Sequence, residues 1–348
     1  MTKSRVPFLF LMFVVVLFGA QAKTPLRFVL ARRIGFASLL QPGEYVGGAA
    51  GMGQHLMVVV RNLGNKSQAL FSDDYAQWRP ITSLPYIYEI TAAGNAFIAL
   101  GVLPPSERVS IFVTTDDGIS WTKAFEPPPV CGMSSFASDS PSVYLRCTPG
   151  AEIVASHDNG TTWNVLPLPA LNQLPPKKTG AATYMVASKG RLLISRPIAF
   201  YGGYPGVSSE IDVLMLSIDG GQSWSAVGPA GYAIEDLQGR ESRFCAEGRS
   251  DAPNDKAHMF MSNDAGMNWS EISLPAPNGR IFLTSSNGLG FVNRRITGFG
   301  SEELVPSIFE SIDGGHSWQR TGINGELFSV SPLVFTDKAG LFSLDVSE

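Results

Sequence analysis

The chain has 348 residues, a formal net charge of −4 and only 16% charged residues, whereas soluble domains average roughly 25%. This balance gives no general attraction to nucleic acid, so we exclude a nucleic-acid partner. The length exceeds one ordinary domain of about 100–200 residues, but repeat folds and large all-β domains are exempt from that limit.

Residues 1–22 have the pattern of a secretory signal peptide. Lys3 and Arg5 precede an apolar run over residues 6–18, and residues 20–22 (Ala-Gln-Ala) supply a small-residue cleavage site. The alternative is a membrane anchor, but a spanning helix needs about 20 apolar residues and this run is shorter. We therefore predict that residues 23–348 form the mature protein, which is secreted or periplasmic and monomeric and has no membrane span.

One octad recurs along the chain: Ser/Thr-x-Asp-x-Gly-x-Thr/Ser/Asn-Trp. Five copies are complete, and a sixth at residues 72–78 is one residue short and has Ala76 in place of glycine. The aspartates are Asp74, Asp116, Asp158, Asp219, Asp264 and Asp313, and the tryptophans, which are all six of the chain, are Trp78, Trp121, Trp163, Trp224, Trp269 and Trp318. Asp and Ser side chains accept hydrogen bonds from turn amides, and glycine adopts positive φ without steric cost. The octad therefore predicts a structural turn between two strands.

The segments around each octad predict a four-stranded antiparallel unit. An apolar or alternating run precedes the octad, as at residues 109–113, and two more runs lie upstream, as at 90–93 and 96–100 around the turn Gly94-Asn95. No segment has a sustained helical period. Repeated four-stranded units of this length are typical of β-propeller blades, so we predict an all-β fold with a single propeller over residues 23–348.

The octad spacing favours seven blades, with six as the alternative. The aspartates lie 42 to 61 residues apart, which leaves about one blade to be assembled from the two ends of the mature chain. Residues 327–330 and 340–344 are the predicted inner strands of this last blade, and residues 26–30 and 36–40 are its outer strands. Closing the ring in this way leaves no free sheet edge.

Three cysteines in an oxidising compartment allow one disulfide and one free thiol. Cys131 and Cys147 lie symmetrically about Asp139, within the turn-like sequence Ser-Asp-Ser-Pro. Residues equidistant from a hairpin turn face each other across the strands, so we predict a Cys131–Cys147 disulfide. Cys245 is then the free and buried thiol.

The octad resembles the repeat of the Asp-box, or bacterial neuraminidase repeat, family over nearly the whole mature chain. That family includes sialidases, xyloglucan-degrading hydrolases, sortilin-type receptors and propeller factors that assist photosystem II assembly. The resemblance implies the propeller fold and octads on the rim opposite the ligand face, but it leaves the function open. Sialidases of this group also share an Arg-Ile-Pro motif, whereas the nearest strings here, Arg79-Pro80-Ile81 and Arg196-Pro197-Ile198, have a different order.

Arginines near the ends of predicted second strands indicate a ligand face opposite the octads. Guanidinium groups suit carboxylate, phosphate or sulfate, so one hypothesis is an anionic ligand; the alternative is that these side chains are solvated or paired with neighbouring acids. The insertion at residues 197–210 adds aromatic rings on a long loop, where binding often resides. The predicted ligand-binding residues are Arg61, Arg196, Tyr201, Tyr204, Arg280, Arg294 and Arg295.

We therefore predict an exported, non-catalytic binding or assembly propeller that holds a protein or a glycan. The alternative is a sialidase-like glycoside hydrolase, which needs two carboxyl groups roughly 5–10 Å apart. Glu89, Glu235 and Asp236 are the candidate acids, and the alternative is that each is a solvated or paired surface acid. The four histidines lack zinc-ligand spacing, so we predict neither a metal nor a cofactor.

Overall fold

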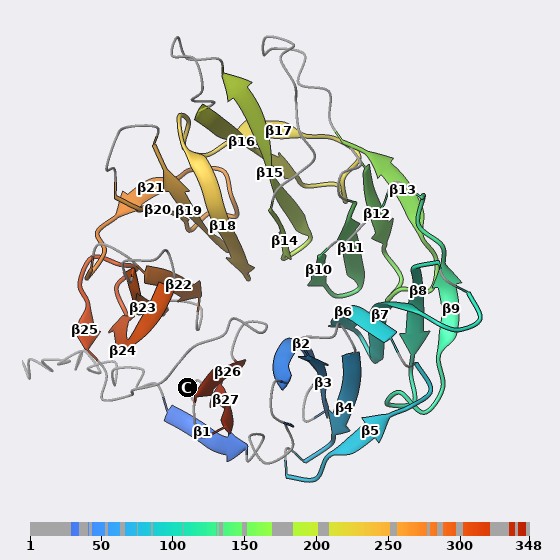
Figure 1. Cartoon of the computed structure of the whole chain (residues 1–348). Coiled ribbons are helices and arrows are strands. Elements are labelled where there is room, and N and C mark those ends of the chain that lie inside the picture. The colour runs from blue at the N-terminus through green and yellow to red at the C-terminus, as the bar shows by residue number, and fades with distance from the viewer. Residues whose placement is uncertain are drawn as a thin grey trace, which may run out of the picture.

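The computed structural model describes residues 29–345 with gaps, of which the longest are 35–40, 169–183, 201–208 and 321–333. The predicted signal peptide, the loop residues Tyr201 and Tyr204, and the predicted strands at 36–40 and 327–330 lie outside the described residues. All regular structure in the described part is β-strand. Figure 1 shows the strands arranged as sheets around a common axis, so the chain folds as an all-β propeller, as predicted.

The described strands form six four-stranded antiparallel sheets and one three-stranded sheet. The first three four-stranded sheets are β2 (Glu44–Met52), β3 (His55–Asn62), β4 (Ser67–Ser72) and β5 (Arg79–Ile81); β6 (Tyr86–Ala93), β7 (Ala96–Val102), β8 (Ser110–Thr114) and β9 (Thr122–Phe125); and β10 (Phe136–Asp139), β11 (Ser142–Arg146), β12 (Glu152–Ser156) and β13 (Asn164–Pro167). The next three are β14 (Met185–Ser188), β15 (Arg191–Phe200), β16 (Ser209–Ser217) and β17 (Ser225–Val227); β18 (Ala233–Arg240), β19 (Arg243–Arg249), β20 (His258–Ser262) and β21 (Ser270–Ile272); and β22 (Gly279–Leu283), β23 (Leu289–Ile296), β24 (Glu302–Ser311) and β25 (Gln319–Arg320). In each, the first strand lies nearest the axis and the fourth lies on the outside (Figure 1).

The seventh sheet joins the two ends of the described chain. It consists of β1 (Val29–Ile34), β27 (Gly340–Asp345) and β26 (Val334–Asp337), in the order β1-β27-β26. The predicted pairing of an N-terminal strand with the strand at 340–344 is therefore confirmed, but β1 shares only residues 29–30 with the strand predicted at 26–30. The third strand lies at 334–337, however, because β26 forms a tight hairpin with β27 in which Asp337 is opposite Gly340. The number of blades in the whole chain stays a prediction.

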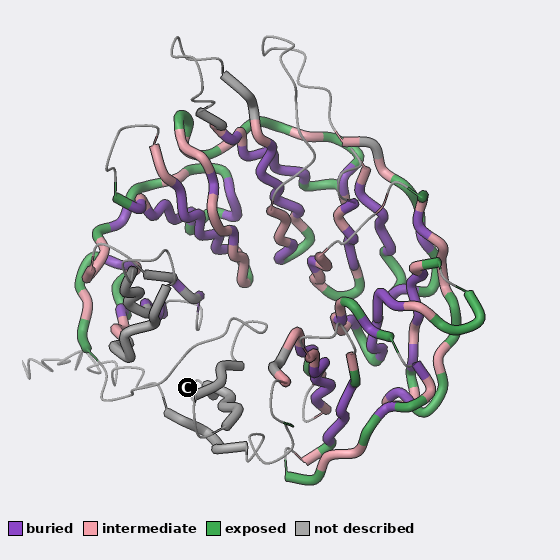
Figure 2. Tube along the Cα trace, in the orientation of Figure 1, coloured by how far each residue is buried: buried purple, intermediate pink, exposed green. Residues whose placement is uncertain are grey.

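The hydrophobic core lies between neighbouring sheets. One cluster combines Met57 and Phe71 of the first sheet with Ile90, Phe97 and Phe112 of the second, and four similar clusters follow around the ring. The middle strands are nearly continuous runs of buried residues, because both of their faces are covered (Figure 2). Stability therefore depends on contacts between adjacent blades.

The octads connect the third and fourth strands, as predicted, and each forms a hydrogen-bonded turn. Asp116 accepts the N–H and the hydroxyl of Ser120 at 2.9 and 2.6 Å, and Thr114 Oγ1 accepts the N–H of Gly118 at 3.0 Å. The complete octads at 156–163, 217–224, 262–269 and 311–318 repeat this pattern. Hydrogen bonds from the residue four positions later lower the carboxyl pKa to about 2 in Asp116, Asp219, Asp264 and Asp313.

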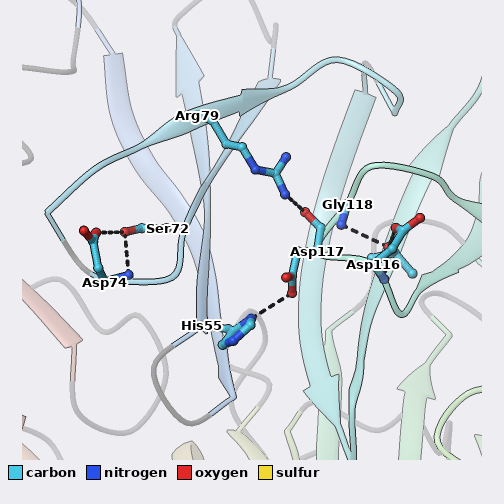
Figure 3. A network of polar contacts seen from close by, with 8 residues as sticks. His55, Ser72, Asp74, Arg79, Asp116, Asp117 and Gly118 are labelled. Carbon is cyan, nitrogen blue, oxygen red and sulfur yellow. Dashed lines mark hydrogen bonds and ion pairs between the residues drawn. The ribbon is translucent and has the colours of Figure 1, made fainter.

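The octads also attach each blade to the preceding one. Figure 3 shows the contacts of the second blade's octad: His55 Nδ1 lies 2.8 Å from Asp117 Oδ1, and Arg79 donates to the carbonyl of Asp117. In the shorter octad, Asp74 accepts the N–H groups of Ala76 and Gln77, both at 2.7 Å. The tryptophans of the five complete octads pack on the core clusters between blades; they are Trp121, Trp163, Trp224, Trp269 and Trp318.

Polar contacts also connect the hairpins between first and second strands, close to the axis. Four of these contacts each join two neighbouring sheets: Gly94 N–H to Ser140 Oγ, Gly190 N–H to the Asp139 carboxylate, Ser188 Oγ to Glu241 O, and Arg243 Nη1 to Gly288 O. On this side of the ring, polar contacts therefore link neighbouring blades to one another.

The predicted disulfide between Cys131 and Cys147 is present, with Cα atoms 4.4 Å apart. The two cysteines are not equidistant from the turn, because Asp139 is opposite Ser142 and the turn is centred on Ser140-Pro141. Cys131 precedes β10 and reaches Cys147 from outside the paired part of the hairpin. Cys245 is free and buried, as predicted, and burial raises the pKa of its thiol.

The β14–β15 hairpin offers a stabilising substitution. Its two turn residues, Lys189 and Gly190, have φ values of +51° and +73°, as in a type I′ turn, where Asn-Gly is the preferred sequence. Lys189→Asn is therefore expected to raise the free energy of unfolding by about 0.5–1 kcal/mol. Urea denaturation should detect the increase. Lys189→Ala removes the same charge without the preference for positive φ, and an equal gain in that control would contradict the explanation.

Candidate functional site

The ends of the second strands lie on the face opposite the octads, which we call the loop face. In an antiparallel meander, successive connections alternate between the two ends of the sheet. Arg61 lies at the end of β3, and residues 86–89 lie at the beginning of β6 in the next blade. The loop face therefore brings residues from neighbouring blades together near the axis.

Arg61, Tyr88 and Glu89 form a cluster on the loop face. Arg61 Nη2 donates a hydrogen bond to the backbone carbonyl of Tyr88. A Cβ atom on Gly47 would lie 2.5 Å from Arg61 Nε, so a larger residue there would displace the arginine side chain from this position. The arginine is thus held between the first and second blades, with its guanidinium beside Glu89.

Two β-bulges shape this cluster. The β2–β3 register shifts between Val46 and Gly48, and the β6–β7 register shifts between Ile87 and Glu89. A third shift occurs at the same place in β18, between Ile234 and Asp236. A bulge inserts one residue and changes the direction of the neighbouring side chains. At these positions the first strands of three blades, β2, β6 and β18, therefore present their side chains differently from a regular strand.

The carboxyl group of Glu89 titrates unusually. Burial raises its pKa from 4.5 to about 7, although the positive charge of Arg61 acts in the opposite direction. A carboxyl group with this pKa is partly protonated at neutral pH, so it donates or accepts a hydrogen bond. Glu89 is therefore not a simple solvated surface acid.

Large apolar and aromatic side chains are exposed beside the cluster. Tyr86, Tyr88 and Leu103 expose 42%, 38% and 39% of their surface. Tyr86 and Tyr88 belong to β6, and Leu103 follows β7, which is the strand paired with it. These three residues were absent from our predictions, because strand alternation alone does not distinguish an exposed position beside a bulge.

The fifth blade carries the other two candidate acids. Glu235 Oε2 accepts a hydrogen bond from Arg249 Nε at 2.9 Å, and Asp236 Oδ2 accepts one from Gln238 at 3.0 Å. Glu235 is thus a paired surface acid, which was one of the two predicted possibilities. The three candidate acids thus lie in two different blades: Glu235 and Asp236 are in β18 and Glu89 is in β6, with two other sheets between these strands along the ring (Figure 1).

The structure changes the expected position of Arg196. We predicted that Arg196 lies near the end of a second strand, but β15 continues to Phe200, and Pro197 is opposite Asp212 in the register. Arg196 is therefore in mid-strand and only 4% exposed, and burial lowers its pKa. Its predicted role in ligand binding stays a prediction.

The remaining predicted arginines are located by their backbone only. Arg280 is in β22 opposite Val292, while Arg294 and Arg295 are in β23 opposite Leu304 and Glu303. Of the predicted arginines whose side chains are described, Arg61 lies in the first blade and Arg196 in the fourth.

Among the described residues, no group of three or more His, Cys, Asp or Glu side chains is arranged to hold a metal ion. Nor does that part of the chain contain a helix that is long and apolar enough to cross a membrane.

No protein-family model matches the chain, and no curated protein matches it in sequence. Membership of the Asp-box family therefore stays a prediction. Among solved structures, the chain is similar to YCF48 from Cyanidioschyzon merolae, with 13% identity and a TM-score of 0.57 over 89% of this chain and 97% of that one. It is also similar to YCF48 bound to D1 peptide, with 17% identity and a TM-score of 0.57 over 89% and 95% of the two chains.

A polysaccharide lyase, the PL25 ulvan lyase bound to -[GlcA(1-4)Rha3S]-, has 12% identity and a TM-score of 0.50 over 79% of this chain and 82% of its own. At these identities the similarity shows the fold alone, which is the β-propeller.

Proposed function

We propose that this chain is a non-catalytic binding or assembly propeller whose loop face holds a segment of another protein. The observation that carries the proposal is the exposed group of Tyr86, Tyr88 and Leu103 beside Arg61. Tyrosine and arginine are enriched at the energetic centres of protein interfaces, where an apolar body and a polar end are both useful. The solved complex of YCF48 with D1 peptide gives a precedent for a peptide ligand on this fold.

A peptide selection tests the proposal. Random twelve-residue peptides displayed on phage are selected on the purified protein, and the recovered peptides are measured against variants by isothermal titration calorimetry. We expect Tyr88→Ala to weaken binding at least about tenfold, as for a residue at the centre of an interface. Ile119→Ala is the matched control, because Ile119 is 70% exposed on an octad turn at the opposite face. Peptides that depend on Ile119 but not on Tyr88, or no selected peptides at all, would refute the proposal.

The second candidate is a glycoside hydrolase, and Glu89 is the observation that favours it. A glutamic acid with a pKa of about 7 is suited to act as a general acid at neutral pH. Turnover of a panel of fluorogenic glycosides, including a sialoside, tests this candidate. Activity that Glu89→Gln reduces by roughly a hundredfold or more would favour the hydrolase over the binding propeller.

The proposal includes export to a secreted or periplasmic location. The signal-like sequence of residues 1–22 and the Cys131–Cys147 disulfide support it, since disulfides persist mainly in oxidising compartments. Expression of the full chain in a bacterial host, followed by fractionation and intact mass analysis, should yield a periplasmic protein that begins at Lys23. Recovery of the uncleaved chain in the cytoplasm would contradict export.

A further inference from the structure

A pocket of about 350 Å³ lies between the fourth and fifth blades, away from the cluster at Arg61. Gly228 and Tyr232 come from the segment that connects β17 to β18, while Phe260, Trp269 and Glu271 belong to the fifth blade. The octad residue Met267, which is 57% exposed, completes this lining. The pocket thus combines three aromatic rings, a thioether and one carboxylate.

The aromatic rings form walls in different planes. The ring centroids of Tyr232 and Phe260 are 4.7 Å apart, and the rings meet at 59°. Trp269 is fixed by a hydrogen bond from its indole N–H to the carbonyl of Gly266 at 2.9 Å. A Cβ atom on Gly228 would lie 3.4 Å from Trp269 Nε1 and 2.8 Å from Leu214, so the glycine allows the connecting segment to approach the indole closely.

The carboxylate is specific to this blade. Glu271 is 54% exposed, and its Oε1 lies 2.7 Å from Nδ1 of His258. In the other blades with complete octads, the residue two positions after the tryptophan is not acidic: it is Lys123, Val165, Ala226 or Arg320. The fold itself therefore does not require an acid at this position.

We propose that this pocket binds the cationic end of a basic side chain from a partner protein. The negative faces of aromatic rings attract ammonium and guanidinium groups, and a carboxylate adds a charge-assisted hydrogen bond. A sugar would need several polar partners, whereas most of the lining is apolar or aromatic and Glu271 is its one charged side chain. This inference goes beyond the proposed function, because the pocket lies between other blades than the cluster of Arg61, Tyr88 and Glu89 and does not depend on that cluster.

Titration with two small amides tests the proposal. N-acetyl-arginine amide carries the guanidinium, and N-acetyl-citrulline amide has nearly the same shape without the charge. Binding is followed by NMR at the indole N–H of Trp269 and the methyl group of Met267 in the full chain. We expect a dissociation constant of about 1–10 mM for the arginine amide and at least about fivefold weaker binding of the citrulline amide.

Variants distinguish binding of the arginine amide in the pocket from a nonspecific attraction of its positive charge to the protein. Glu271→Gln changes an exposed side chain and should weaken arginine amide binding about five- to tenfold, whereas Asp73→Asn, an exposed acid elsewhere, should leave it unchanged. Tyr232→Leu should also weaken binding, and thermal unfolding will show whether that variant is folded. The double variant Arg61→Ala, Tyr88→Ala should bind the amide normally, so failure of the proposed function at the Arg61 cluster is distinguishable from failure of the pocket. Equal affinity for both amides, no binding at 50 mM, or no effect of Glu271→Gln would overturn the proposal.

Discussion

Gly160→Ala is expected to lower the free energy of unfolding by about 3 kcal/mol. Gly160 has a φ of +84°, and a Cβ atom there would lie 2.7 Å from Cδ1 of Ile98, a fully buried residue of the preceding blade. The substitution thus adds backbone strain and also overpacks the core between two blades. Equilibrium denaturation in urea, followed by tryptophan fluorescence, should measure the loss.

Gly190→Ala separates the two causes. Gly190 has a similar φ of +73°, but a Cβ atom there would meet nothing within 4 Å. Only the backbone strain remains, so the expected loss is about 1 kcal/mol. If both variants lost the same stability, the contact with Ile98 would have no role, and the octad glycine would be explained by its backbone conformation alone.

The contact at Gly160 also explains why the sequence predicted the fold so well. The octad places glycine and tryptophan at fixed positions, and both residues pack against the preceding blade. Each copy therefore specifies a turn and an interface between blades. The same repetition predicted the strands around Gly94-Asn95 and the sheet that combines β1 with β27.

The candidate site was harder to predict, because its geometry depends on register. We expected Arg196 near the end of a strand, but β15 continues through Pro197, so Arg196 is in mid-strand and buried. The bulges at Gly47 and Tyr88 place Arg61 beside Glu89, and no local pattern in the sequence marks them. The pocket at Tyr232 and Trp269 combines segments from two blades, which a repeat analysis treats separately.

Glu89→Gln is expected to stabilise the protein at pH 8 by about 2 kcal/mol and to have little effect at pH 4. The pKa of Glu89 is about 7 in the folded protein and 4.5 for an ordinary glutamate, so the folded protein binds this proton more tightly than the unfolded chain. The stability that the bound proton gives to the folded protein is complete below pH 4.5 and is lost as the pH rises through 7. Glutamine does not ionise, so it avoids the cost of a buried charge at high pH.

Denaturation of both proteins between pH 4 and pH 8 measures this difference, and carbon-13 NMR of the Glu89 carboxyl measures its pKa directly. Arg61→Leu should raise that pKa further, because the arginine charge favours the ionised carboxylate. Glu271→Gln is the control: its carboxyl is exposed, so no comparable gain at pH 8 is expected. A pH-independent effect of Glu89→Gln would mean that burial does not raise the pKa of Glu89. The second candidate function, a hydrolase with Glu89 as its general acid, would then lose its physical basis. A confirmed pKa near 7 would leave a neutral hydrogen-bond donor beside Tyr88, and a peptide carbonyl could use that donor as readily as a glycosidic oxygen.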